Sequence, residues 1–131
     1  MHLSSLSRVE AFTTLDGSTI RELAHPSWTP ARNQSLAEAT VPAGAETLAH
    51  LHRESEELYY FTAGSGRLRV GDEERDVAAG DCVVIPPGTP HKLWAGSGAP
   101  LVLLCCCAPA YADADTELLE KETARSADRP S

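Results

Sequence analysis

From residue 34 onward, short segments of four to seven residues are separated by turns, most of which contain glycine or proline. The segments are, in order, SLAEATV (35–41), TLAHLH (47–52), LYYFTA (58–63), RLRV (67–70), ERDV (74–77), CVVI (82–85), HKLWA (91–95) and LVLLCCC (101–107). Proline falls between the segments, as at Pro86-Pro87-Gly88, where a missing N–H costs little. Strands of this length with turn residues between them predict an all-β sandwich or barrel.

The two ends of the chain carry a weaker pattern. Residues 1–33 alternate weakly and turn at Asp16-Gly17 and near His25-Pro26, which predicts one or two edge strands and a loop. Residues 34–110 form the predicted barrel core. Residues 111–131 include DTELLEKETAR, which has helical propensity and a plausible cap at Asp115 or Thr116. We therefore expect a short C-terminal helix or arm and a disordered tail, all within one domain of 131 residues.

Charge and hydropathy argue against two classes of partner. The formal net charge is −8, and no cluster of lysine or arginine is present, so a nucleic-acid partner is not expected. No stretch approaches the roughly 18 apolar residues of a membrane span. The N-terminal residues MHLSSLSRVE lack the basic run and apolar stretch of a secretory signal. The sequence therefore predicts a cytoplasmic protein with no membrane partner.

Four cysteines are present, and three of them are consecutive. Neighbouring residues of a strand point to opposite faces, so Cys105, Cys106 and Cys107 cannot easily pair with one another. With no secretory signal, free thiols in a reducing compartment are the better interpretation. Burial as small apolar side chains is the simplest role, and metal ligation by one of them is the alternative. Their spacing matches no closed zinc site.

Residues suited to metal ligation lie in two of the glycine-punctuated segments. In an extended strand, residues i and i+2 lie about 7 Å apart on one face, so His50 and His52 project together. The charged turn RESE then lets the next strand run back antiparallel, with Glu57 near its start. His91 opens another strand directly after the Pro-Pro-Gly turn. Imidazole nitrogens and a carboxylate oxygen suit first-row transition metals, so four ligands from three strands could converge inside a barrel.

The same residues carry a resemblance to a known family. The first segment fits the pattern G-x5-H-x-H-x4-E-x6-G, from Gly44 to Gly64. The second fits G-x5-P-x-G-x2-H, from Gly80 to His91. These patterns resemble the two motifs of the cupin superfamily, over about residues 34–109. The resemblance implies a small antiparallel jelly-roll barrel that often forms a homodimer. It also implies a divalent metal held by four ligands: His50, His52, Glu57 and His91.

One position departs from the family pattern, and several others have weaker assignments. The second motif commonly ends in asparagine where this chain has Ala95, a position expected to line the pocket. Tyr59 and Phe61 should share the ligand face; Tyr59 is a candidate catalytic residue through its hydroxyl, although filling of the barrel is the simpler role. Arg32 and Gln34 could lie at the barrel mouth or in a solvated loop. The remaining assignments place side chains away from the ligands: Glu56 outward, His2 and His25 in loops or on the surface, Lys92 facing away from His91, and Trp94 on a dimer or sheet-packing surface.

The implied ligand set suggests a reaction class without fixing it. Four protein ligands around an octahedral ion leave two positions for a small chelating, oxygenated molecule. With Fe, one position could take O2, which favours a dioxygenase-like enzyme. With Zn, Mn or Ni, isomerase or lyase chemistry is more natural, and Cu is also compatible with the ligands. A non-catalytic binding or sensing module is the alternative from a different class, and a metal-free structural barrel is a third.

Overall fold

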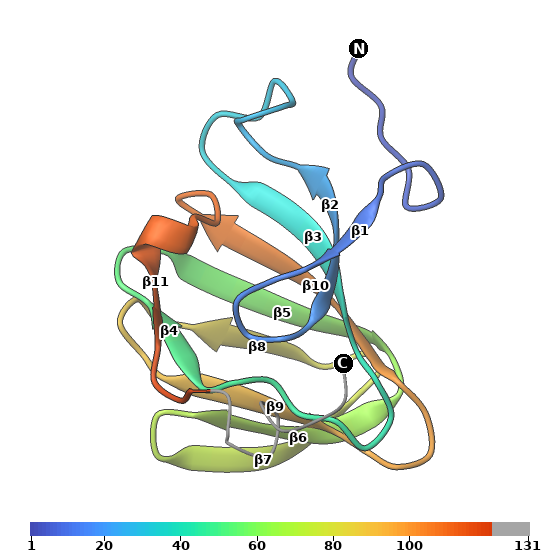
Figure 1. Ribbon diagram of the computed structural model, residues 1–131, viewed down its shortest axis with the longest axis vertical. Helices are drawn as coiled ribbons and strands as arrows, with labels where there is room; N and C mark the ends of the chain where they lie inside the picture. The colour runs from blue at the N-terminus through green and yellow to red at the C-terminus, as the bar shows by residue number, and fades with distance from the viewer. Residues whose placement is uncertain (122–131) are drawn as a thin grey trace.

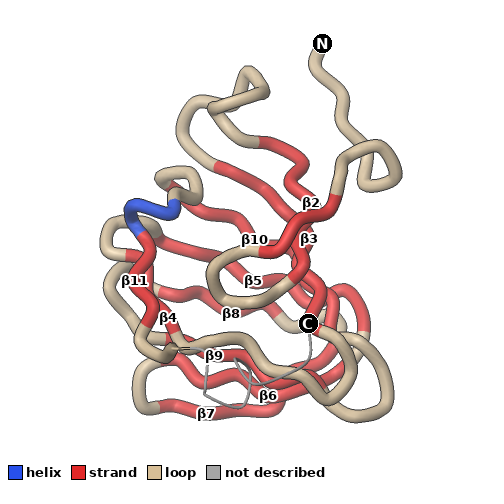
Figure 2. Tube along the Cα trace, viewed as in Figure 1, coloured by secondary structure: helices blue, strands red, loops and turns tan. Residues whose placement is uncertain are grey.

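Two antiparallel sheets face each other in the computed structural model, which describes residues 1–121 (Figures 1 and 2). The first sheet has the strand order β1-β2-β3-β10-β5-β8, and the second has the order β11-β4-β9-β6-β7. The strands are β1 (Ala11–Thr13), β2 (Thr19–Ala24), β3 (Ser35–Val41), β4 (His50–His52), β5 (Glu56–Ala63), β6 (Ser65–Val70), β7 (Glu73–Ala78), β8 (Cys82–Ile85), β9 (His91–Ala95), β10 (Leu101–Ala108) and β11 (Thr116–Leu118). This architecture confirms the predicted all-β jelly-roll barrel.

Alternation along the strands places the core between the sheets. In β5, Tyr59 and Phe61 are buried, while Leu58 and Tyr60 face outward. Phe61, Leu101 and Leu103 are fully buried and form the centre of the core with side chains from both sheets. Successive side chains of a strand point to opposite faces, so the two-residue period of the sequence predicted this division.

The turn between β4 and β5 connects the two sheets. β5 was expected to run back antiparallel to β4, but it pairs with β10 and β8 in the first sheet, whereas β4 pairs with β9 and β11 in the second. Ligand-type residues on β4 and β5 therefore face each other across the barrel interior. This arrangement brings His52 and Glu57 together even though their strands share no ladder.

The predicted C-terminal helix is wrong over the residues that the structure describes. A single 3-10 turn, η1 (Asp113–Asp115), is followed by the extended strand β11, which lies along β4 (Figure 1). Thr116 pairs with His52 and Leu118 with His50. Hydrogen bonds to the free edge of β4 outweigh the local helical propensity, so the segment is the ordered arm of the alternative prediction. The predicted tail, residues 126–131, lies outside the described residues.

No helix among residues 1–121 is long and apolar enough to cross a membrane.

Candidate metal centre

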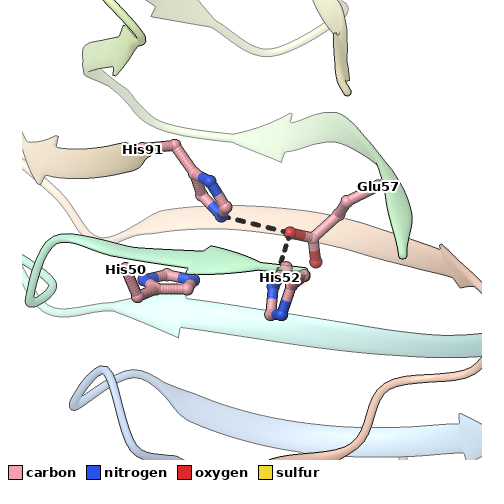
Figure 3. A group of neighbouring side chains, drawn as sticks. All are labelled: His50, His52, Glu57 and His91. Carbon is pink, nitrogen blue, oxygen red and sulfur yellow. Dashed lines mark ion pairs between the residues drawn. The ribbon is translucent and has the colours of Figure 1, made fainter. Parts of the chain in front are cut away.

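Four buried side chains from three strands converge on one point inside the barrel (Figure 3). His50 and His52 come from β4, Glu57 from β5 and His91 from β9. One potential ligand atom from each residue lies within 4.8 Å of those of the other three. The Nε2 atoms of His52 and His91 lie 3.2 Å and 3.3 Å from Glu57 Oε1. The structure thus brings together all four predicted ligands.

The hydrogen bonds of the imidazoles fix which nitrogen faces the centre. His50 Nδ1 lies 2.9 Å from the Leu48 carbonyl oxygen, and His91 Nδ1 lies 2.9 Å from the Thr89 carbonyl oxygen. A carbonyl can only accept, so each Nδ1 carries the proton and each neutral ring keeps a lone pair on Nε2. All of these lone pairs are available at the centre.

His52 also carries its proton on Nδ1, and its hydrogen-bond acceptor is a side chain of the C-terminal arm. Its Nδ1 lies 3.0 Å from Thr116 Oγ1. That hydroxyl donates its own hydrogen to the Ala112 carbonyl oxygen at 2.9 Å, so it accepts from the ring. Contacts of this kind orient metal-binding histidines in proteins.

The centre contains buried acceptors that have no partner. Among the described residues, Glu57 Oε1 and His91 Nε2 are buried side-chain atoms without a hydrogen bond. Two acceptors 3.3 Å apart repel each other unless a proton or a cation lies between them. Three imidazole nitrogens and one carboxylate oxygen are a donor set that suits a divalent transition metal. The cluster therefore has the geometry and chemistry of a metal site.

Burial and neighbouring groups shift the proton affinities of these residues. Burial alone would raise the pKa of the Glu57 carboxyl, but the imidazoles of His52 and His91 beside it outweigh burial and hold the pKa well below its usual range. Burial, reinforced by His91, lowers the pKa of His50. At neutral pH both shifts favour an ionised carboxylate and a neutral imidazole, which are the forms that bind a metal.

We expect the metal-free protein to lose stability as the pH falls from 7.5 to 5.5. The pKa of His50 is lower in the folded protein than its ordinary value of about 6.5, so below that pH the unfolded chain binds more protons. The contribution of His50 to the free energy of unfolding is fully present above its pKa in the unfolded chain. Below that pKa the contribution decreases by up to about 1.4 kcal/mol for each pH unit. Thermal melting of the metal-free protein across this range measures the slope. His50→Gln should flatten it and His2→Ala should not; an unchanged melting temperature in the wild type would contradict the prediction.

Two residues that support the centre were not identified from the sequence. Cys107 is buried, and its thiol donates to Glu57 Oε2 at 3.2 Å, which leaves Oε1 facing the histidines. Burial, with Glu57 beside it, raises the pKa of this thiol far above neutral, so it remains a donor. The sequence indicated burial as a small apolar side chain, with metal ligation by one of the cysteines as the alternative, and did not indicate a hydrogen bond to Glu57. Thr116 was considered only as a helix cap, because its pairing with β4 depends on the fold.

A third residue missed in the sequence, Asp16, reaches the centre from the loop between β1 and β2. Its Oδ2 lies 3.8 Å from His50 Nε2, and its side chain is mostly buried. The only sequence signal was the Asp-Gly dipeptide, which predicted a turn. Nothing in the local pattern indicated that the turn folds over the barrel.

A narrow cavity of about 60 Å³ lies beside the centre. Its wall includes His50, His52, Glu57 and Tyr59, together with apolar side chains from both sheets. Tyr59 is buried, with its ring 5.9 Å from that of His91, and burial with nearby Glu57 raises the pKa of its hydroxyl. The hydroxyl therefore stays protonated and can donate a hydrogen bond. Its catalytic role stays a prediction.

The other predicted positions fall into two groups. Arg32 and Gln34 are exposed and outside the cavity wall, as a solvated loop would place them. Ala95 was expected to line the pocket, but it packs in the core because it lies at the far end of β9 from His91. The side chains expected to lie away from the ligands do so: Glu56 and His2 are exposed, His25 binds the Tyr111 carbonyl oxygen, Lys92 contacts Glu46 and Glu120, and Trp94 lies under Arg69.

Comparison with known proteins gives one family. A family model described as "Cupin domain" matches residues 37–107. The uncharacterized protein MJ1618 of Methanocaldococcus jannaschii is 47% identical over 113 residues, which cover 86% of this chain and 90% of that protein.

Solved structures of the same fold include two proteins named for their activities. The polyketide cyclase RemF of Streptomyces resistomycificus is 23% identical, with a TM-score of 0.79 over 96% of this chain and 90% of its own. The nucleoside dehydratase Pac13 is 16% identical, with a TM-score of 0.77 over 100% of this chain and 99% of its own. A Streptomyces Pac13 variant has been solved with uridine. At these identities the likeness shows the fold alone.

Proposed function

We propose that this chain, which belongs to the cupin family, is a divalent-metal-dependent enzyme that acts on a small oxygenated molecule. The observation that carries the proposal is the convergence of three Nε2 lone pairs on the unpartnered Glu57 Oε1. The cavity described above lies beside these four residues, so a small molecule in the cavity would contact the metal. A metal that served only to hold the barrel together would need no adjoining cavity.

The residues of the centre have separate roles in this proposal. His50, His52, Glu57 and His91 hold the ion, which is one of Fe, Mn, Zn, Ni or Cu. When bound, the ion would polarise and orient a ligand that offers neighbouring oxygen atoms. Tyr59 keeps its proton and donates a hydrogen bond to an oxygen of the substrate. The apolar wall of the cavity excludes bulk water from the substrate.

Two reaction classes fit this centre. If the ion is Fe, it could bind O2 in place of one substrate oxygen, which would support a dioxygenase-like reaction. Elimination or isomerisation without O2 is the second candidate, and the activities named for Pac13 and RemF favour it. Both classes require the same four ligands and differ in their need for O2.

The test begins with protein purified without a metal-affinity tag. Elemental analysis identifies the ion, and native mass spectrometry detects any retained ligand. We expect one divalent ion per chain and turnover of small neutral diols by the metal-loaded protein. A dioxygenase would consume O2, and a lyase or isomerase would form product without O2.

Tyr59→Phe should retain the metal, and its turnover should be lower by about tenfold or more. Reversible diol binding without turnover under every metal would contradict the enzyme and favour a non-catalytic binding module.

A homodimer is the assembly that we propose for this chain. Leu58, Tyr60 and Val84 are exposed on the outer face of the first sheet, and β5 pairs Leu58 with Val84 of β8. An apolar face on adjacent strands suits a self-complementary contact between two copies.

A further inference from the structure

Asp16 is held in a fixed position above the centre by its own loop. Its Oδ1 accepts three hydrogen bonds, from Thr14 Oγ1 at 2.8 Å, Ser18 N at 2.9 Å and Ser18 Oγ at 2.6 Å. Its carbonyl oxygen accepts from Leu48 N at 2.8 Å, which ties the loop to the segment that leads into β4. Gly17 has φ of +92°, a conformation that glycine adopts without strain.

These contacts leave one carboxylate oxygen of Asp16 free at the cavity. With Oδ1 saturated by three donors, Oδ2 is left to face His50 Nε2 at 3.8 Å. Because His50 Nδ1 donates to Leu48, its Nε2 cannot donate to Asp16 while the ring is neutral. Asp16 also lies outside the group of four residues whose ligand atoms converge. Its Oδ2 is therefore an acceptor that the protein itself does not use.

The charged side chains in the cavity wall are all acidic. Within residues 1–121, its charged side chains are the carboxylates of Asp16, Glu22 and Glu57, and no lysine or arginine lines it. Lys92, a buried cation of β9, alternates away from His91 and is bound by Glu46 and Glu120. A divalent ion held by Glu57 would be the one cation here, and the carboxylates of Glu57, Asp16 and Glu22 together outweigh its charge. A second carboxylate or a phosphate in this cavity would therefore meet a net negative wall with no cationic side chain.

We propose that the centre selects neutral, hydroxyl-bearing ligands, and that Asp16 is the specificity-determining residue that accepts a hydrogen bond from the ligand hydroxyl. This inference rests on the proposed metal-dependent function and names the substrate class. Buried polar groups that await a donor reject ligands that cannot supply one. Asp16 Oδ2 lies 3.8 Å from Nε2 of His50, one of the four residues that converge on the metal position, so one ligand would contact both the ion and Asp16.

A pair of matched ligands tests whether the centre prefers a neutral ligand to an anionic one. 4-Methylcatechol and 3,4-dihydroxybenzoate share the same diol and differ in a neutral methyl group against a carboxylate. Isothermal titration calorimetry of the Zn-loaded protein, without O2, measures both affinities. We expect the neutral diol to bind at least about tenfold more tightly. Equal affinities, tighter binding of the acid, or no binding of either diol to the metal-loaded protein would overturn the proposal.

Asp16→Asn tests the residue with little change of shape. Thr14 and Ser18 will hold the amide oxygen where Oδ1 lies, so the amide nitrogen, a donor, replaces the free acceptor Oδ2. We expect the neutral diol to bind about tenfold more weakly and the preference over the acid to disappear. Asp72→Asn, at an exposed turn, removes the same charge and should change neither affinity.

Metal content separates failure of this inference from failure of the metal centre. Elemental analysis of each protein before titration should give one ion per chain in the wild type and in Asp16→Asn. Wild-type protein that holds no metal would refute the proposed function itself. Loss of metal in Asp16→Asn alone would make Asp16 a metal ligand and would overturn its role in ligand selection.

Discussion

His91→Ala is expected to abolish stoichiometric metal binding. His91 is fully buried, and its Nε2 is one of the two acceptors without a partner at the centre. Alanine removes one of four ligands and leaves Glu57 Oε1 facing an empty space. Loss of a supporting residue alone typically lowers metal affinity 10- to 100-fold, so loss of a ligand should lower it by more than about 100-fold. Elemental analysis of protein purified without an affinity tag measures the ion content.

Three variants make this result specific. His2→Ala removes an exposed histidine and should retain one ion per chain. Cys107→Ala removes the thiol that holds Glu57 Oε2 and should weaken metal binding without abolishing it, whereas Cys107→Ser keeps a donor there. Full metal content in His91→Ala, with the variant folded by circular dichroism, would show that His91 is not a ligand and would remove the main support for the proposed function.

Local pattern was enough to predict most of the strands. CVVI and HKLWA coincide with β8 and β9, and SLAEATV coincides with β3. Short strands bounded by glycine and proline leave few alternatives, because turn residues and two-residue alternation act over a few neighbours. The four ligand-type residues could also be predicted to converge. Alternation places His50 and His52 on one face, and the motifs resemble those of a family whose fold is a closed barrel.

The wrong helix prediction and the missed supporting residues both depend on contacts between distant segments of the chain. The C-terminal segment has helical propensity, but the free edge of β4 offers it hydrogen bonds, and no local pattern contains that edge. Asp16 lies 34 positions before His50 and meets it only because the first hairpin folds over the barrel. The link between Cys107 and Glu57 requires the pairing of β10 with β5. Residues that support the site are thus harder to predict than residues in its motifs.

Gly66→Ala is expected to cause a large loss of stability. Gly66 pairs with Ala95 across β6 and β9, and a Cβ added there would overlap the carbonyl oxygen of Trp94 and press on Leu101. The first obstacle is backbone, so it cannot move aside as a flexible side chain would. The two strands must separate, at a cost of about 3 kcal/mol in the free energy of unfolding. Urea unfolding followed by circular dichroism measures the change.

Gly98→Ala is the matched control for this prediction. An added Cβ at Gly98 meets no atom within 4 Å, and the glycine does not have a positive φ, so we expect a change of less than about 0.5 kcal/mol. Because β9 also carries His91, separation of β6 from β9 should weaken metal binding in Gly66→Ala even where the variant remains folded. A Gly66→Ala protein as stable as Gly98→Ala would mean that β6 and β9 do not approach as closely as the structure places them, and the position of His91 would then lose its support.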